Sequence, residues 1–256
     1  MHGLKVTFLG TGTSQGIPVI GSKHPVCLSD DPRDKRLRVS ICIQWDDYSY
    51  VIDCGPDFRQ QMLGMQIERL DGILFTHEHA DHTAGIDDIR PFFFNQGDIP
   101  IYAHKRVLAA LHRRFDYIFE IDNKYPGAPG VDEHIIENSP FELNGMQVIP
   151  VNGYHHELQV FGFRFNKFAY LTDMKTLSDI EKDKLKGLDV LVVNALRHEQ
   201  HVSHFNLEEA LELIESVQPK QAYLTHISHL LGFHEDVQQK LPKDVFLAYD
   251  GLVLNL

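Results

Sequence analysis

Cysteine is scarce in this sequence of 256 residues, which contains only Cys27, Cys42 and Cys54. Three cysteines cannot build a disulfide framework, and this excludes the class of small secreted domains that disulfides hold together. A reducing compartment is the simplest interpretation, and we therefore expect a cytoplasmic protein.

Long apolar runs are also absent. No stretch of 18 or more apolar residues occurs, so we expect no transmembrane helix and no membrane partner. The N-terminal run Met1–Val6 lacks the apolar core and the cleavage site of a signal peptide. The sequence shows no repeat, linker or low-complexity tract, and 43% of its residues are apolar. We therefore expect one domain over residues 1–256.

Positive charge is in deficit. The chain has 24 Lys and Arg against 36 Asp and Glu, a formal net charge of -12. This balance disfavours broad binding to nucleic acid, whose affinity depends on phosphate neutralisation. A small anionic substrate remains compatible, because bound divalent cations would offset the negative charge locally.

Histidine, by contrast, is abundant, and its 16 copies are clustered. The run Thr76-His77-Glu78-His79-Ala80-Asp81-His82 follows an apolar strand and combines three imidazoles with a carboxylate. Imidazole binds Zn, Fe and Mn, and carboxylate adds charge. His77 and His79 alternate along an extended end and can reach one ion, whereas Asp81 and His82 can reach a second. The alternative is a solvated polar turn before a helix.

Strand and helix patterns alternate along the chain, which indicates an α/β protein with helices on the outer faces of sheets. We expect strands at Lys5–Leu9, Val39–Trp45, Tyr48–Ile52, Gly72–Phe75, Pro100–Ala103, Gln147–Val151, Val160–Phe165, Phe168–Leu171, Asp189–Asn194, Gln221–Leu224 and Val245–Ala248. We expect helices at Asp57–Met65, Lys105–Ile118 and Leu207–Val217, the last with Asn206 as N-cap.

Three more side chains that can bind metal follow expected strands. His156 follows the strand ending at Val151, Asp173 ends the strand around Tyr170, and His226 ends the strand around Tyr223. Ligands at strand ends meet at one edge of a sheet. Asp173 is suited to bridge two ions, since a carboxylate has two oxygens. His155 adjoins His156, and the sequence alone does not separate them.

This set resembles the metallo-β-lactamase superfamily. The resemblance implies an αββα four-layer sandwich with a two-metal site. It assigns His77, His79 and His156 to the first ion and Asp81, His82 and His226 to the second, with Asp173 and a hydroxide bridging them. No thiolate enforces a soft metal, so two Zn or Mn ions are expected, and Fe is also compatible.

Motifs outside the set of candidate metal ligands indicate one family within this superfamily. They resemble the cyclic phosphodiesterase family of the carbon–phosphorus lyase pathway, which implies hydrolysis of a small or cyclic phosphodiester by the bridging hydroxide. A phosphorylated ribose 1,2-cyclic phosphate is the candidate substrate, and a homodimer is compatible. The motifs are Gly10–Pro18, His156 five residues before Phe161-Gly162, Leu224–His229 and Tyr249-Asp250-Gly251.

Two residues are candidates for work beside the ions. His204 precedes the helix at Leu207–Val217, and the resemblance implies that it contacts the phosphate or assists the leaving group. An exposed capping-region histidine is the alternative. Asp53, at the end of a strand, can orient a ligating imidazole. His198 and His201 are expected to be surface residues, and Asp81 is counted with His204 as catalytic.

A structural zinc site is the least determined feature. The related family builds it from a Cys-x-Cys-x-x-Cys run and the histidine at the position of His229. Here the run is Ser22-Lys23-His24-Pro25-Val26-Cys27, so only Cys27 keeps its thiol. His24, Cys27 and His229 give three good ligands, one fewer than a closed site needs. Zinc and a hydrogen-bonded loop both remain open.

Other members of the superfamily are rival interpretations. A transfer-RNA 3′-processing nuclease shares the metal set, but the acidic balance and the absence of a basic arm disfavour it. A thioester or lactone hydrolase is a second rival interpretation. Model substrates would distinguish it from a phosphodiesterase. A non-hydrolytic metal-binding accessory protein is a third, and the complete set of seven ligands disfavours it.

Overall fold

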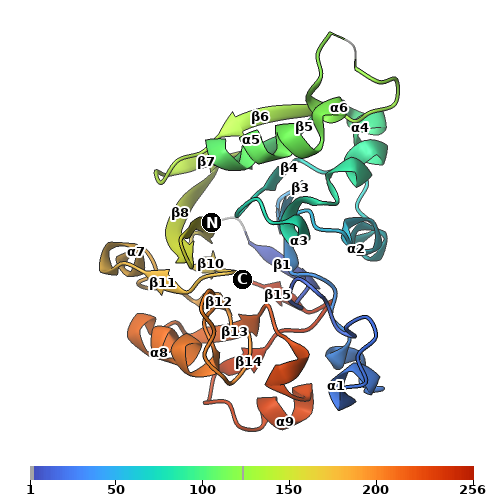
Figure 1. Ribbon diagram of the computed structural model, residues 1–256. Coiled ribbons are helices and arrows are strands. Elements are labelled where there is room, and N and C mark those ends of the chain that lie inside the picture. The colour runs from blue at the N-terminus through green and yellow to red at the C-terminus, as the bar shows by residue number, and fades with distance from the viewer. Residues whose placement is uncertain (1–2, 123) are drawn as a thin grey trace. The chain divides into compact units, whose positions relative to one another are not determined.

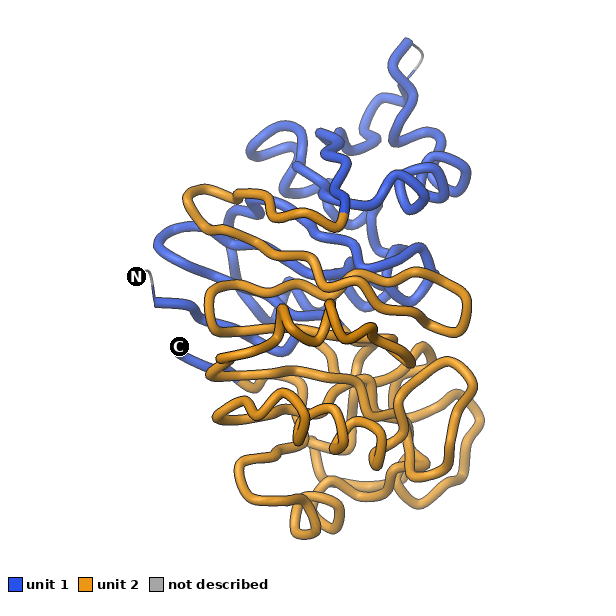
Figure 2. Tube along the Cα trace, turned by 90° about the vertical axis from the view of Figure 1, so that its left-hand side faces the viewer, with its two compact units in different colours: residues 1–9, 40–137, 253–256 blue, residues 10–39, 138–252 orange. Residues whose placement is uncertain are grey.

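The computed structural model describes residues 3–122 and 124–256. Met1, His2 and Asn123 lie outside the described residues, so the first two positions of the N-terminal run are not covered. The chain divides into two compact units, coloured separately in Figure 2. Unit 1 comprises residues 1–9, 40–137 and 253–256, and unit 2 comprises residues 10–39 and 138–252. The single domain over 1–256 stays a prediction.

Unit 1 contains a seven-stranded sheet in the order β15-β1-β2-β3-β4-β5-β6. The last four strands of that order are parallel, whereas β15 runs antiparallel to β1 and β2 antiparallel to β3. The strands are β1 (Lys5–Gly10), β2 (Ser40–Trp45), β3 (Tyr48–Ile52), β4 (Gly72–Leu74), β5 (Ile99–Ala103), β6 (Val131–Ile135) and β15 (Val253–Asn255).

The helices of unit 1 pack on one face of this sheet, where α5 lies along β5 and β6 (Figure 1). Phe58, Val107 and Leu111 share a buried core with Val51 and Ile101 of the strands. The opposite-facing Ile41, Ile43, Ile52 and Leu74 are also fully buried, so both faces of the sheet are covered. The helices are α2 (Phe58–Met65), α3 (Ala80–Thr83), η2 (Ile86–Ile89), α4 (Arg90–Gln96), α5 (Lys105–Arg114) and α6 (Asp116–Phe119).

Unit 2 contains an eight-stranded sheet in the order β11-β8-β9-β10-β12-β13-β14, with β7 paired to β8. Strands β10, β12, β13 and β14 are parallel, and β9 is antiparallel to both β8 and β10. The strands are β7 (Phe141–Leu143), β8 (Met146–His155), β9 (Leu158–Phe165), β10 (Phe168–Tyr170), β11 (Thr176–Leu177), β12 (Val190–Asn194), β13 (Gln221–Thr225) and β14 (Val245–Leu247).

Helix α8 (Leu207–Val217) packs on β12 (Figure 1). Asn206 accepts a hydrogen bond from Glu209 N–H, and the Glu209 carboxylate accepts one from Asn206 N–H, so the expected cap is a complete capping box. No helix in the described part of the chain is both long and apolar enough to cross a bilayer. The other helices are α1 (Pro25–Leu28), η1 (Pro32–Asp34), α7 (Asp179–Asp183), η3 (His229–Leu231) and α9 (His234–Gln238).

The ends of the strands position the residues of interest. In unit 1, the parallel strands β3 and β4 end just before Asp53 and Thr76-His77. In unit 2, β8, β10 and β13 run in one direction and end at or just before His155, Asp173 and His226. Asp53, Asp173 and His226 have φ of 65°, 55° and 54°, a left-handed conformation that is uncommon outside glycine and clusters at functional sites.

Candidate metal centre

The histidine run of unit 1 lies where β4 ends and α3 begins. His77 and His82 are fully buried, His79 is the exposed N-cap residue of α3, and Asp81 is in its first turn. The structure therefore places the run after a strand, as the sequence predicts, and shows that a short helix begins within it.

Asp53 is the buried acceptor that orients this run. Its Oδ2 lies 2.6 Å from Nδ1 of His82. Its two oxygens also accept hydrogen bonds from the backbone N–H and the hydroxyl of Thr76, both at 2.8 Å. Burial raises the pKa of Asp53, while the charge and hydrogen bond of His82 lower it. Because Nδ1 of His82 donates to the carboxylate, Nε2 carries the lone pair that a metal needs.

The same chain of hydrogen bonds reaches His77. The single hydroxyl hydrogen of Thr76 is directed to Asp53, so the Thr76 oxygen accepts from Nδ1–H of His77 at 3.0 Å. Nε2 of His77 then carries a lone pair and faces Nδ1 of His79 at 3.0 Å. Two imidazole nitrogens that face each other this closely suit a shared proton or a shared cation, so Asp53 prepares both His77 and His82 as ligands.

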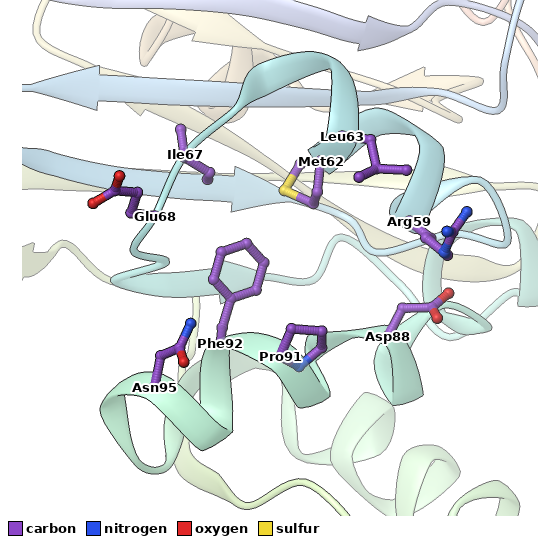
Figure 3. A pocket seen from close by; sticks show the side chains of 9 residues that line it. All are labelled: Arg59, Met62, Leu63, Ile67, Glu68, Asp88, Pro91, Phe92 and Asn95. Atoms are coloured by element: carbon purple, nitrogen blue, oxygen red, sulfur yellow. The ribbon is translucent and has the colours of Figure 1, made fainter.

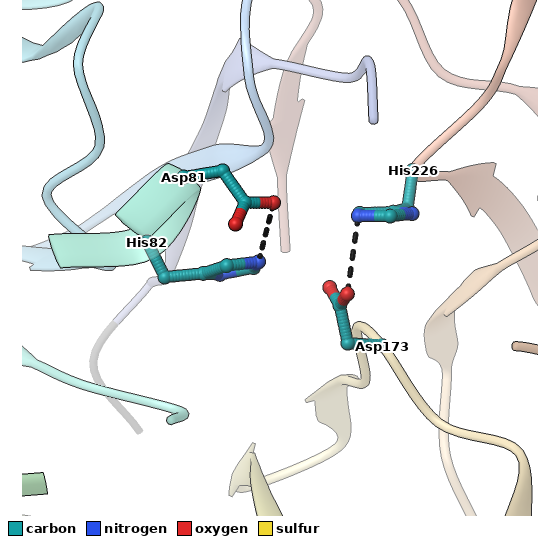
Figure 4. A group of neighbouring side chains, drawn as sticks. All are labelled: Asp81, His82, Asp173 and His226. Atoms are coloured by element: carbon teal, nitrogen blue, oxygen red, sulfur yellow. Dashed lines mark ion pairs between the residues drawn. The ribbon is translucent and has the colours of Figure 1, made fainter. Parts of the chain in front are cut away.

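The spacing of ligand atoms within each unit also suits a metal. Nitrogen or oxygen ligands about 2.0–2.1 Å from a tetrahedral ion lie about 3.3 Å apart. In unit 1, Nε2 of His82 lies 3.3 Å from Oδ2 of Asp81 (Figure 4). In unit 2, Nε2 of His226 lies 3.2 Å from Oδ1 of Asp173 (Figure 4). The donor types and distances therefore fit divalent ions.

Asp173 is the central carboxylate of unit 2. Its Oδ2 accepts a 2.7 Å hydrogen bond from the hydroxyl of Thr172, which leaves Oδ1 facing His226 and, at 3.6 Å, Nδ1 of His204. His155, Asp173 and His204 each bring one ligand atom within 4.8 Å of the others. Asp173 thus lies beside the imidazoles of His155, His204 and His226.

The structure distinguishes His155 from His156, the two neighbouring histidines that the sequence does not separate. Strand β8 continues through Gly153 to His155, and His156 begins the turn into β9, exposed and with φ of 58°. His155 is buried and donates from Nδ1 to the carbonyl of Ser203 at 2.7 Å, so its Nε2 presents a lone pair. His155, and not His156, therefore lies in a group with Asp173 and His204, and the ligand itself stays a prediction.

His204 is buried, which contradicts the alternative of an exposed capping residue. Burial lowers the pKa of His204 to about 2, the charge of Asp173 opposes that shift, and His226 and His155 add to it. The imidazole is therefore neutral at pH 7 in the protein without ions. A neutral ring donates one hydrogen bond and can contact a phosphate as well as assist a leaving group.

The Ser22–Cys27 loop contains two of the three candidate zinc ligands. The rings of His24 and His229 lie edge to face with centroids 4.9 Å apart. Nδ1 of His24 accepts from Val26 N–H and so caps α1, and Cys27 is buried beside Val26. Within residues 3–122 and 124–256, His24, Cys27 and His229 do not bring three ligand atoms within 4.8 Å of one another. A zinc ion here stays a prediction.

Three functional candidates were not identified from the sequence. Thr76 and Ser203 act through hydrogen bonds to His77 and His155 that no spacing reveals. His201, expected on the surface, is only partly exposed and lies against His204 with ring centroids 5.1 Å apart. The only sequence feature that could have identified His201 was its position three residues before His204 in the same loop.

Unit 1 also has a cavity of about 780 Å³ between α2 and α4 (Figure 3). None of the predicted site residues lines it, and its wall includes no histidine or cysteine. It is therefore separate from the histidine run. The lining residues are Arg59, Met62, Leu63, Ile67, Glu68, Asp88, Pro91, Phe92 and Asn95.

Comparison with known proteins defines the class. The beta-lactamase superfamily domain matches residues 48–227, so the chain belongs to the beta-lactamase superfamily. The chain is also similar over its full length to a diphosphatase of the PhnP family, with 39% identity, coverage of 100% of this chain and 98% of that chain, and a TM-score of 0.94. It has the metallo-β-lactamase fold, and the predicted αββα sandwich is confirmed.

Longer proteins also match. An octanoyltransferase from Porphyromonas gingivalis is 36% identical over 97% of this chain but only 51% of its own length. Ribonuclease Z from Methanococcus maripaludis is 24% identical over 73% of this chain and 55% of its own length. The chain thus spans about half the length of the curated relatives it matches. The fold of the superfamily implies a divalent-metal site, and the donor set described above suits one.

Substitution of the two adjacent histidines tests which of them is a metal ligand. His155→Ala is expected to lower metal affinity about 10- to 100-fold, because a prepared ligand and its hydrogen bond to Ser203 are both lost. His156→Ala, the matched control, should keep wild-type affinity. Titration with a competing chelator measures both variants. Equal affinities, or greater loss in His156→Ala, would restore the original choice.

Proposed function

We propose that this protein is a dinuclear metal-dependent phosphodiesterase that hydrolyses a small or cyclic phosphodiester. The observation that carries the proposal is the full-length similarity to a diphosphatase, a protein that acts at phosphorus. The match to ribonuclease Z adds a second relative that acts on phosphodiesters. Both similarities point to phosphorus rather than to a carbonyl as the atom attacked.

We assign the ligands as follows. His77, His79 and His155 would hold the first ion, Asp81, His82 and His226 would hold the second, and Asp173 would be shared between them. Supporting this set are the hydrogen bonds from Asp53, Thr76 and Ser203 that direct lone pairs to Nε2 of three imidazoles. Zn or Mn is expected, with Fe compatible, since the set contains no thiolate.

Two such ions, when bound, would supply a nucleophile near neutral pH and would offset the charge of the phosphoryl oxygens. The residues of the chain do the rest. Asp53 and Ser203 hold the imidazoles in their ligating tautomers, and Asp81, with its carboxylate against His82, belongs to the catalytic set. His204, buried beside Asp173, contacts the phosphate or the leaving oxygen.

The proposed partner is a small molecule. The net charge of -12 disfavours a long nucleic acid, so a phosphorylated ribose 1,2-cyclic phosphate remains the candidate. A phosphoanhydride is a second candidate class, which the similarity to a diphosphatase favours. A homodimer stays a prediction.

A substrate panel on the metal-loaded protein tests this function. The panel is bis(p-nitrophenyl) phosphate, the ribose cyclic phosphate, a dinucleotide diphosphate, a precursor transfer RNA and an octanoyl thioester. The thioester is included because a relative of twice this length is named for acyl transfer. We expect turnover of the small phosphodiesters and none of the transfer RNA or the thioester. Turnover of the thioester alone would disprove the proposal.

A further inference from the structure

The loop that follows β12 contains three histidines, and the structure separates them. His198 is exposed, whereas His204 is buried against both His155 and His226, with ring centroids 4.3 and 4.8 Å away. His201 is partly buried, and its ring lies 5.1 Å from that of His204 at an angle of 33°. His201 therefore extends the stack of imidazoles at the candidate metal centre by one ring.

Hydrogen bonds with the backbone of Ser203 determine which ring nitrogen carries the proton in His155 and in His201, and the two rings differ in this respect. Its carbonyl oxygen can only accept, so Nδ1 of His155 donates and Nε2 of His155 carries the lone pair. Its backbone N–H can only donate, so Nδ1 of His201 accepts at 3.3 Å. The proton of the neutral His201 ring must then be on Nε2. One serine thus prepares His155 as a ligand and His201 as a hydrogen-bond donor.

The other donors beside this loop already have partners. Nζ of Lys175 lies 2.5 Å from the Glu209 carboxylate, and the guanidinium of Arg197 donates to the carbonyls of Glu199 and Gln200. No partner for Nε2 of His201 occurs among residues 3–122 and 124–256. A partly buried donor without a protein partner beside an anion-binding centre is placed to receive a ligand.

We propose that His201 binds the phosphate group of the substrate through Nε2–H, as a binding residue distinct from the metal ligands and from His204. The inference rests on the proposed phosphodiesterase function and adds to it a specific contact. The ligand class is a phosphoryl group, whose oxygens accept hydrogen bonds strongly. A neutral donor suits a substrate whose charge the metal ions already offset.

Two isosteric substitutions distinguish the nitrogens of His201. In His201→Gln, the side-chain amide N–H occupies the region of Nε2 and keeps a donor there. In His201→Asn, the amide oxygen occupies the region of Nδ1 and keeps the contact with Ser203, but the distal donor is lost. His198→Ala on the same loop is the matched control, because His198 is exposed.

The variants are measured in two assays on metal-loaded protein: steady-state hydrolysis of bis(p-nitrophenyl) phosphate, and calorimetric binding of inorganic phosphate. We expect His201→Asn to raise KM and the phosphate Kd about 10- to 100-fold, the range for a lost charge-assisted hydrogen bond. His201→Gln should stay within about threefold of wild type, and His198→Ala should be unchanged. Metal content should be equal in all four proteins.

Two outcomes overturn the proposal. Equal phosphate Kd values for the Asn and Gln variants would show that Nε2–H makes no contact. The reverse order, with Asn the better substitute, would show that only the bond to Ser203 matters. If wild-type protein does not hydrolyse the diester, the proposed function fails instead, and the order of phosphate Kd values still decides the role of His201.

Discussion

Replacement of Asp173 by Asn is expected to remove at least one metal ion and to lower phosphodiester turnover by about 10³-fold or more. The carboxylate lies between His226 and His204, and its loss removes the negative charge that would hold two cations together. Charge stabilisation by a metal ion contributes several kcal/mol to such a reaction. Elemental analysis and kcat for bis(p-nitrophenyl) phosphate measure the two effects.

Asn is the informative substitution because position 173 has φ of 55°. Asn tolerates the left-handed region and keeps the shape of the side chain, so the variant isolates the charge. Asp183→Asn is the matched control, since its side chain is 64% exposed. A variant Asp173→Asn that kept two ions and most of its turnover would contradict the bridging assignment.

Replacement of His204 by Ala is expected to lower kcat by about 10²–10⁴-fold while both ions remain bound. Because the ring is neutral and buried beside Asp173, we expect it to act on the substrate as a hydrogen-bond donor. If its hydrogen bond stabilises the leaving oxygen, the loss should shrink for a p-nitrophenyl ester, whose leaving group is a stable anion, and grow for an alkyl ester. Comparison of kcat for the two esters makes this measurement.

Metal content supplies the control for this variant. His204 has one ligand atom within 4.8 Å of His155 and Asp173, so the geometry also permits metal binding. If His204→Ala loses an ion in elemental analysis, His204 is a ligand and its assignment to the substrate is wrong. Equal losses of kcat for both esters, with metals retained, would leave phosphate contact as its function.

Much of the fold was predictable because its strands are short, apolar and bounded by turns. The strand at Tyr48–Ile52 and the helix at Leu207–Val217 match the prediction residue for residue. Strand β6 was missed, since Val131–Ile135 contains Asp132, Glu133 and His134 and lies at the edge of its sheet. The predicted helix Lys105–Ile118 is divided at Phe115, whose φ of -128° interrupts it between α5 and α6.

The candidate ligands could be predicted where they are adjacent in sequence. The prediction was ambiguous where a shift of one residue decides between two neighbouring histidines. The run from His77 to His82 has a specific spacing, and its place at a strand end followed from the apolar residues before it. The end of β8 could not be predicted in this way, because Asn152-Gly153-Tyr154 resembles a loop. In the structure, pairing with β9 extends the strand to His155. With the strand expected to end at Val151, the sequence did not separate His155 from His156. Contacts with Ser203 depend on tertiary structure and leave no pattern.

The left-handed backbone at Asp53, Asp173 and His226 has a consequence for how such a protein can change over generations. Gly, Asn, Asp and His adopt this conformation more readily than other residues, so most other side chains would strain the turns at these three positions. Asn is among the tolerated residues but is a poor ligand. A single substitution to Asn can therefore abolish ligation at these positions while the chain still folds. A β-branched replacement disrupts both ligation and the fold.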